Sequence, residues 1–208
     1  MAIIPWSAPS GGRVAVSPEP NAAPPRNGLL VLVVGPSGAG KDSVIGYCRD
    51  RLAASGRVVF PRRVITREES GETEDHATVS EDDFHRMVSE GAFALHWRAH
   101  GLGYGIPASI ADDLAAGRSV VVNVSRSVID EARRRFPPVL VASVTAPVEV
   151  LADRLARRGR ESPERIQFRL ERRGIYTVEG DDVLVLNNAG PIERSGDALI
   201  DALNRGGA

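Results

Sequence analysis

The stretch from Leu29 to Lys41 reads LLVLVVGPSGAGK and decides the fold class. Its first six residues form a continuous apolar run, which is typical of a strand buried on both faces of a parallel sheet. The glycine-rich loop that follows has the spacing G-x-x-x-x-G-K of a phosphate-binding loop. Val44, Ile45 and Cys48 then recur at helical spacing, so a helix follows the loop directly. A strand, a glycine loop and a helix in this order predict a P-loop nucleotide site.

The predicted nucleotide-binding residues are the whole loop and the first turn of the helix. Glycines let successive backbone N–H groups turn towards a phosphate, and the helix N-terminus adds partial positive charge. Lys41 is the only lysine among 26 lysine and arginine residues, which favours a functional loop over a ligand-free turn. The expected ATP-binding residues are Gly35, Pro36, Ser37, Gly38, Ala39, Gly40, Lys41, Asp42 and Ser43.

The motif departs from its usual form directly after Lys41. Asp42 occupies the position where serine or threonine is usual, and Ser43 follows it. Ser43 is therefore the candidate Mg²⁺ ligand. A phosphate would repel Asp42 unless this side chain pairs with Lys41 or helps to hold the hydrated metal, and the sequence leaves its role open.

Further apolar runs alternate with helical patterns along the chain. This alternation predicts one α/β domain over residues 28–208, a three-layer P-loop NTPase sandwich with a parallel sheet. Residues 66–105 fit the alternation poorly and are expected to be an insertion, and residues 154–173 carry eight arginines. Residues 1–27 hold six of the 14 prolines and are expected to be a flexible tail, with a short strand at residues 3–6 as the alternative. The expected later strands span residues 58–66, 119–124, 139–144 and 183–186, and helices are expected at 107–116 and after Ser80.

Composition excludes several classes of function. The 208 residues carry a formal net charge of −1, so the chain has no general basic surface for nucleic acid or an acidic membrane. A single cysteine and the lack of an apolar run of about 18 residues suggest a cytoplasmic protein. The sequence does not indicate the oligomeric state.

The loop, together with Ile65-Thr66-Arg67 and Tyr104-Gly105, resembles the guanylate kinase superfamily. The arginine-rich stretch is similar to the lid of that superfamily, with Arg158 and Arg169 at the positions of lid arginines that close over ATP. The resemblance implies that Lys41, Arg158 and Arg169 are catalytic, because phosphoryl transfer depends on positioning and charge stabilisation. The other arginines of the stretch, Arg154 among them, fit a solvated surface equally well.

The acceptor region departs from guanylate kinases. Arg98 falls where a glutamate would read guanine in that superfamily. Ile106 stands in place of a threonine or serine, and Asn123 in place of an aspartate. These changes resemble the ribose 1,5-bisphosphate phosphokinase family of phosphonate degradation, which implies a phosphorylated sugar as the acceptor. The acceptor-binding residues implied by the resemblance are Arg67, His76, Arg98 and Tyr104. The alternatives are a guanylate kinase and a non-catalytic guanylate-kinase-like binding module.

Overall fold

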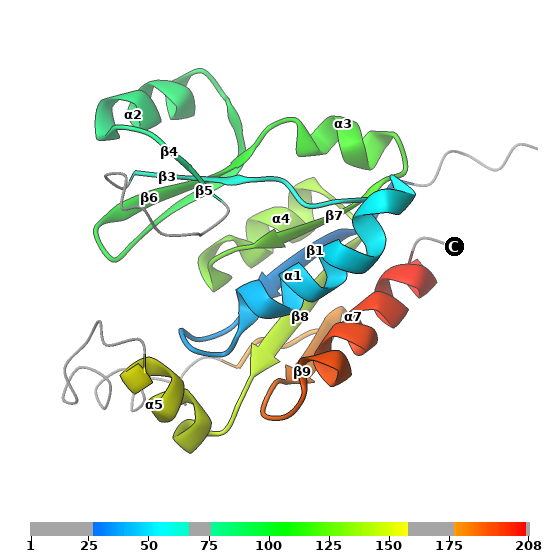
Figure 1. Cartoon of the computed structure of the whole chain (residues 1–208). Helices are drawn as coiled ribbons and strands as arrows, with labels where there is room; N and C mark the ends of the chain where they lie inside the picture. Colours follow the sequence, from blue (N-terminus) through cyan, green and yellow to red (C-terminus); the bar gives the residue numbers. More distant parts are fainter. Residues whose placement is uncertain (1–26, 67–75, 158–176, 207–208) are drawn as a thin grey trace, which may run out of the picture.

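The computed structural model describes residues 27–66, 76–157 and 177–206, which form two sheets and their covering helices (Figure 1). Most of the expected tail therefore lies outside the described residues. In chain order the elements are β1 (Leu30–Val34), α1 (Lys41–Leu52), β2 (Val58–Val59), β3 (Arg63–Ile65), β4 (His76–Thr78), α2 (Glu81–Ser89), β5 (Phe93–Ala99), β6 (Leu102–Pro107), α3 (Ile110–Ala115), β7 (Ser119–Asn123), α4 (Ile129–Arg135), β8 (Val139–Thr145), α5 (Val148–Arg157), β9 (Val183–Asn187) and α7 (Ile192–Gly206).

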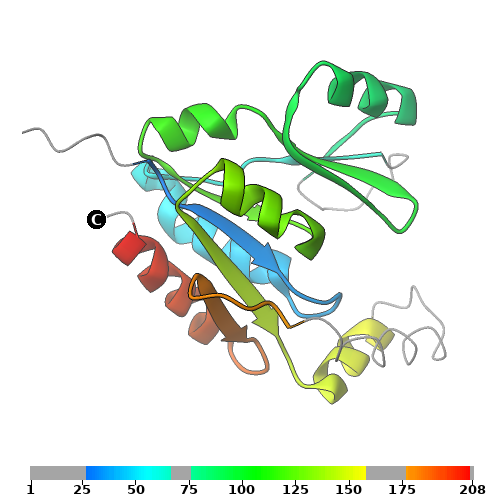
Figure 2. The same cartoon turned by 180° about the vertical axis from the view of Figure 1, so that it is seen from behind.

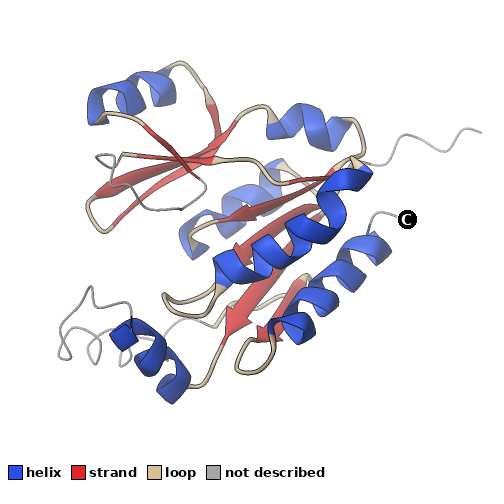
Figure 3. Cartoon of the chain, in the orientation of Figure 1, coloured by secondary structure: helices blue, strands red, loops and turns tan. Residues whose placement is uncertain are grey.

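The larger sheet is parallel throughout (Figure 3). Its strand order is β2-β7-β1-β8-β9. Its central strand β1 is fully buried at all five residues, as the apolar run predicts. Helices α1 and α7 cover one face of this sheet, and α4 lies on the opposite face (Figure 2). The predicted three-layer α/β sandwich is thus confirmed.

Alternation along the strands divides the interior into two cores. Leu30, Leu32 and Val34 point to the side of α3 and α4, whereas Val31 and Val33 point to α1 and α7. Each fully buried side chain of this size contributes about 1.5–3 kcal/mol to folding. The carboxyl ends of all five strands therefore lie on a well-packed platform, which is where parallel sheets bind ligands.

A second, four-stranded sheet with the order β4-β3-β6-β5 accounts for the region predicted as an insertion. Strands β5 and β6 form a hairpin whose two-residue turn, His100-Gly101, has positive φ at both positions. Helix α2 begins after Ser80, whose side chain accepts a hydrogen bond from the Asp83 N–H at 3.1 Å, as expected of an N-cap. Phe84 of α2 packs against Phe93 of β5, and this contact closes one face of the sheet.

Two predicted elements differ from the structure. The single strand expected over residues 58–66 is divided at Phe60-Pro61-Arg62, so β2 joins the large sheet and β3 joins the small one. Pro61 lies in the break, because proline cannot donate a ladder hydrogen bond. The helix expected at 107–116 begins only at Ile110, since Pro107 is the last residue of β6. In the part of the chain that the structure describes, no helix is long and apolar enough to span a membrane.

Candidate active site

The P-loop connects the carboxyl end of β1 to the first turn of α1, as predicted. Gly35 has a φ of 143°, and a Cβ there would lie 2.2 Å from the Val144 carbonyl oxygen of β8. The loop therefore passes so close to the neighbouring strand that only glycine fits. Residues 41 onward form helix α1, whose N-terminal N–H groups face the same end of the sheet.

The ammonium group of Lys41 bridges the loop. Its Nζ donates hydrogen bonds to the carbonyl oxygens of Gly35 at 2.9 Å and Pro36 at 3.0 Å. Lys41 is half-buried, whereas the side chains of Ser37, Asp42 and Ser43 are exposed to solvent. The loop thus presents one fixed positive charge and a set of exposed donors at the position expected for a nucleotide phosphate.

Two residues beyond the motif hold the outer side of the loop. The buried Asn188 donates from Nδ2 to the Ala39 carbonyl oxygen at 2.8 Å. Arg154 of α5 donates from Nη2 to the Asn188 carbonyl oxygen at 2.9 Å, and its Nη1 lies 3.4 Å from the Gly38 carbonyl oxygen. Arg154 therefore packs against the P-loop and is not a solvated surface residue. The sequence shows no local signal for this contact, because Asn188 lies almost 150 positions from Ala39.

Asp42 and Asn123 join the loop to the neighbouring strand. Asn123, at the carboxyl end of β7, donates from Nδ2 to Asp42 Oδ1 at 2.7 Å. The Asp42 carboxylate is thus held at the edge of the P-loop next to Ser43. Carboxylate and hydroxyl oxygens are the ligands that Mg²⁺ prefers, so Asp42 and Ser43 fit a metal bound beside the phosphates.

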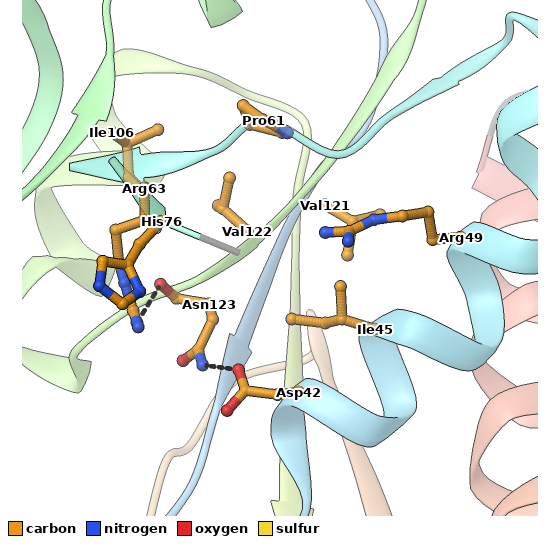
Figure 4. Close-up of a pocket in the computed structure, with 10 residues that line it drawn as sticks. All are labelled: Asp42, Ile45, Arg49, Pro61, Arg63, His76, Ile106, Val121, Val122 and Asn123. Atoms are coloured by element: carbon orange, nitrogen blue, oxygen red, sulfur yellow. Dashed lines mark hydrogen bonds between the residues drawn. The ribbon is translucent and has the colours of Figure 1, made fainter. Parts of the chain in front are cut away.

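A cleft of about 220 Å³ opens beside the P-loop (Figure 4). The cleft arises because β2 pairs with only the first two residues of β7. The chain then crosses to the small sheet, so β2 does not cover the carboxyl-terminal half of β7. The cleft floor is apolar, and polar or charged side chains reach it from α1, β3 and β4. Its lining residues are Asp42, Ile45, Arg49, Pro61, Arg63, His76, Ile106, Val121, Val122 and Asn123.

The structure brings only some of the predicted acceptor residues to this cleft. His76 lines the cleft, and Tyr104 lies on the same face of the small sheet, with the Arg63 guanidinium carbon 5.4 Å from its ring centre. Trp97 is buried in the core and stacks on Tyr104 with ring centres 5.3 Å apart. Arg49 and Arg63 were not predicted as site residues from the sequence. They share a cleft because the chain divides at Pro61 and crosses from the large sheet to the small one.

Arg98 lies on the other face of the small sheet. Trp97 pairs with Tyr104 across the hairpin, so the next residue of β5 points away from Tyr104 and towards α2. There Arg98 hydrogen-bonds Glu81, and this bond lowers the pKa of the Glu81 carboxyl from its usual value. The structure therefore does not bring Arg98 together with His76 and Tyr104.

Three predicted residues, Arg67, Arg158 and Arg169, lie outside the described residues. Among the residues that are described, no cluster of three or more histidine, cysteine or acidic side chains could hold a metal ion. Cys48 is buried in α1, and burial raises the pKa of its thiol to about 12. The thiol is therefore protonated at neutral pH and unsuited to nucleophilic chemistry.

Comparison with known proteins identifies the family of a chain with this loop and cleft. A ribose 1,5-bisphosphate phosphokinase PhnN from Acidiphilium cryptum is 55% identical over 181 residues, covering 87% of this chain and 95% of the relative. The chain belongs to the ribose 1,5-bisphosphate phosphokinase PhnN family. The PhnN protein of Rhodopseudomonas palustris is 50% identical over 172 residues, covering 83% of this chain and 87% of that protein.

The fold of this PhnN family member is also found among solved structures. The crystal structure of guanylate kinase from Anaplasma phagocytophilum matches with a TM-score of 0.61 and 21% identity, covering 86% of both chains. At this identity the match supports the fold alone, and it agrees with the predicted guanylate kinase-like sandwich. No protein-family model matches the chain.

Proposed function

We propose that this protein transfers the γ-phosphoryl group of ATP to the 1-phosphate of ribose 1,5-bisphosphate, giving 5-phosphoribosyl 1-diphosphate and ADP. The observation that carries this proposal is the 55% identity, over almost the whole relative, to a protein named for that acceptor. The local chemistry supports it, because an intact phosphate loop adjoins a cleft that two arginines enter. A non-catalytic binding module has no use for this combination.

The P-loop residues position and stabilise the donor. The backbone N–H groups of residues 35–40 and the N-terminus of α1 hold its phosphates, and Lys41 supplies positive charge to the group in transfer. Arg154 and Asn188 keep the loop in the geometry described above. Asp42 and Ser43 are the residues that would hold Mg²⁺. A bound Mg²⁺ neutralises charge on the phosphate oxygens.

On the acceptor side, the chemistry requires no general base. A phosphate monoester has a second pKa near 6, so an oxygen of the 1-phosphate is already ionised at neutral pH. That oxygen forms a bond to the γ-phosphorus while the bond to the bridging oxygen of ADP breaks. Arg67, His76 and Tyr104 are proposed ligands of the acceptor, and their task is to orient it so that the 1-phosphate meets the donor.

Product analysis tests this proposal directly. Purified protein with Mg-ATP and ribose 1,5-bisphosphate is expected to yield 5-phosphoribosyl 1-diphosphate and ADP in equal amounts, observed by ³¹P NMR. A diphosphate on C1 of the product, with the 5-phosphate still a monoester, identifies the reacting group as the 1-phosphate. Release of inorganic phosphate without that product would contradict the proposal.

The lid arginines supply a second test. Arg158→Ala and Arg169→Ala are each expected to lower kcat by about 10²- to 10³-fold with a smaller change in the KM for ATP, because such arginines act mainly on the transition state. Arg157→Ala is the matched control, since Arg157 is exposed and pairs with Asp153 on α5. Steady-state rates at saturating acceptor measure both constants. Equal rates for all three variants would assign the arginine stretch to solvated surface.

A further inference from the structure

Arg63 is the first residue of β3 and extends into the cleft beside the P-loop (Figure 4). Its guanidinium carbon lies 5.4 Å from the centre of the Tyr104 ring, and its Nη1 lies 3.5 Å from the Asn123 carbonyl oxygen. These contacts hold the side chain on the face of the small sheet that carries His76 and Tyr104. The guanidinium forms no other hydrogen bond to a described residue.

The charge of Arg63 has no counterpart among the described residues. Its Nε is buried and has no hydrogen-bond partner there, and no described carboxylate forms an ion pair with it. Leaving a partly buried guanidinium in this state costs free energy, because the charge loses solvation without a compensating partner. Several other described arginines, in contrast, pair with a carboxylate: Arg86, Arg98, Arg118, Arg133, Arg135 and Arg157.

The surroundings of Arg63 favour an anion. Arg49 reaches the same cleft from α1, so positive charge enters from two elements on an apolar floor (Figure 4). Asp42 is the one carboxylate among the lining residues, and the Asn123 amide already donates to it. A phosphate matches this site, since a planar guanidinium can donate two parallel hydrogen bonds to it.

The position of Arg63 indicates which phosphate of the acceptor it binds. The reacting phosphate must meet the donor at the P-loop, whereas Arg63 is joined to that loop only through Asn123 and Asp42. An anion on Arg63 is therefore displaced from the point of transfer. This displacement suits the second phosphate of a bisphosphate.

We propose that Arg63 binds the 5-phosphate of the acceptor, the one that does not react, and so selects a bisphosphate over a monophosphate. The proposal rests on the function proposed above and adds a specificity-determining residue to it. Arg63 then contributes to acceptor binding and leaves the donor site unchanged.

The test compares Arg63→Met with Arg57→Met, which removes the same charge from an exposed residue that does not line the cleft. Arg63→Met is expected to raise the KM for ribose 1,5-bisphosphate by about 10- to 100-fold, with the KM for ATP unchanged. It should also raise the inhibition constant of ribose 5-phosphate, which carries only the 5-phosphate, by a similar factor. Arg57→Met should change each constant by less than about twofold.

A fall in kcat with unchanged acceptor KM, or unchanged inhibition by ribose 5-phosphate, would overturn the role of Arg63. Loss of folding is checked by circular dichroism, and Arg63→Lys supplies a milder variant that keeps the charge but loses the planar fork. Its acceptor KM is expected between those of the wild type and Arg63→Met. If the wild-type protein itself fails to use ribose 1,5-bisphosphate, the proposed function fails instead, so the two failures are distinguishable.

Discussion

Lys41→Ala is expected to lower kcat by at least about 10³-fold, corresponding to about 4 kcal/mol of transition-state stabilisation. The Lys41 Nζ is held by two carbonyl oxygens of its own loop, so its charge is already in place before the substrates bind. No other lysine exists in the chain to replace it. The preorganised charge is lost entirely when the side chain is truncated.

A coupled assay of ADP release measures this effect, and circular dichroism with thermal unfolding measures the fold. The variant should unfold within a few degrees of the wild type, because Lys41 is only half-buried and packs in neither apolar core. Turnover within tenfold of the wild type in a folded variant would exclude the P-loop as the site of transfer.

Gly40→Ala is expected to lower activity by at least about 100-fold and the free energy of unfolding by about 1–3 kcal/mol. Gly40 has a φ of 85°, which alanine adopts only with strain. Its new Cβ would lie 2.3 Å from Asn188 Nδ2, so the amide that holds the Ala39 carbonyl oxygen must move. The strain and the lost hydrogen bond both displace the loop that binds the donor.

Gly46→Ala is the control for this change. Gly46 lies within α1, and a Cβ there meets no atom within 4 Å. Alanine is favoured over glycine in a helix by about 0.5–1 kcal/mol, so Gly46→Ala should keep full activity and unfold at a slightly higher temperature. Equal stability and activity of Gly40→Ala and the wild type would show that the contact with Asn188 does not shape the loop.

The P-loop could be predicted from sequence because its signal is local. An apolar strand, a glycine spacing and a helix lie within Leu29–Leu52, and each has its own physical cause. The contacts that complete the site are not local. Asn188 and Arg154 meet the loop only after β8, α5 and β9 have packed beside β1.

The placement of Arg98 shows a signal that the sequence did contain. The His100-Gly101 turn fixes a two-residue hairpin, and that register pairs Trp97 with Tyr104. Because side chains alternate across a strand, the register alone places Arg98 on the face opposite Tyr104. Counting positions along the chain ignores this alternation. The position of Arg63 could not be predicted in the same way, since it depends on the chain crossing between the two sheets at Pro61.

We propose that this protein phosphorylates a sugar bisphosphate and not GMP. The most direct measurement is kcat/KM for ribose 1,5-bisphosphate and for GMP, with the same enzyme preparation and saturating Mg-ATP. A cleft that two arginines enter offers the phosphates charged partners, and its lining carboxylate, Asp42, already accepts a hydrogen bond from Asn123. We therefore expect ribose 1,5-bisphosphate to be favoured by at least about 10³-fold. An equal or larger kcat/KM for GMP would show that the protein does not select a sugar bisphosphate.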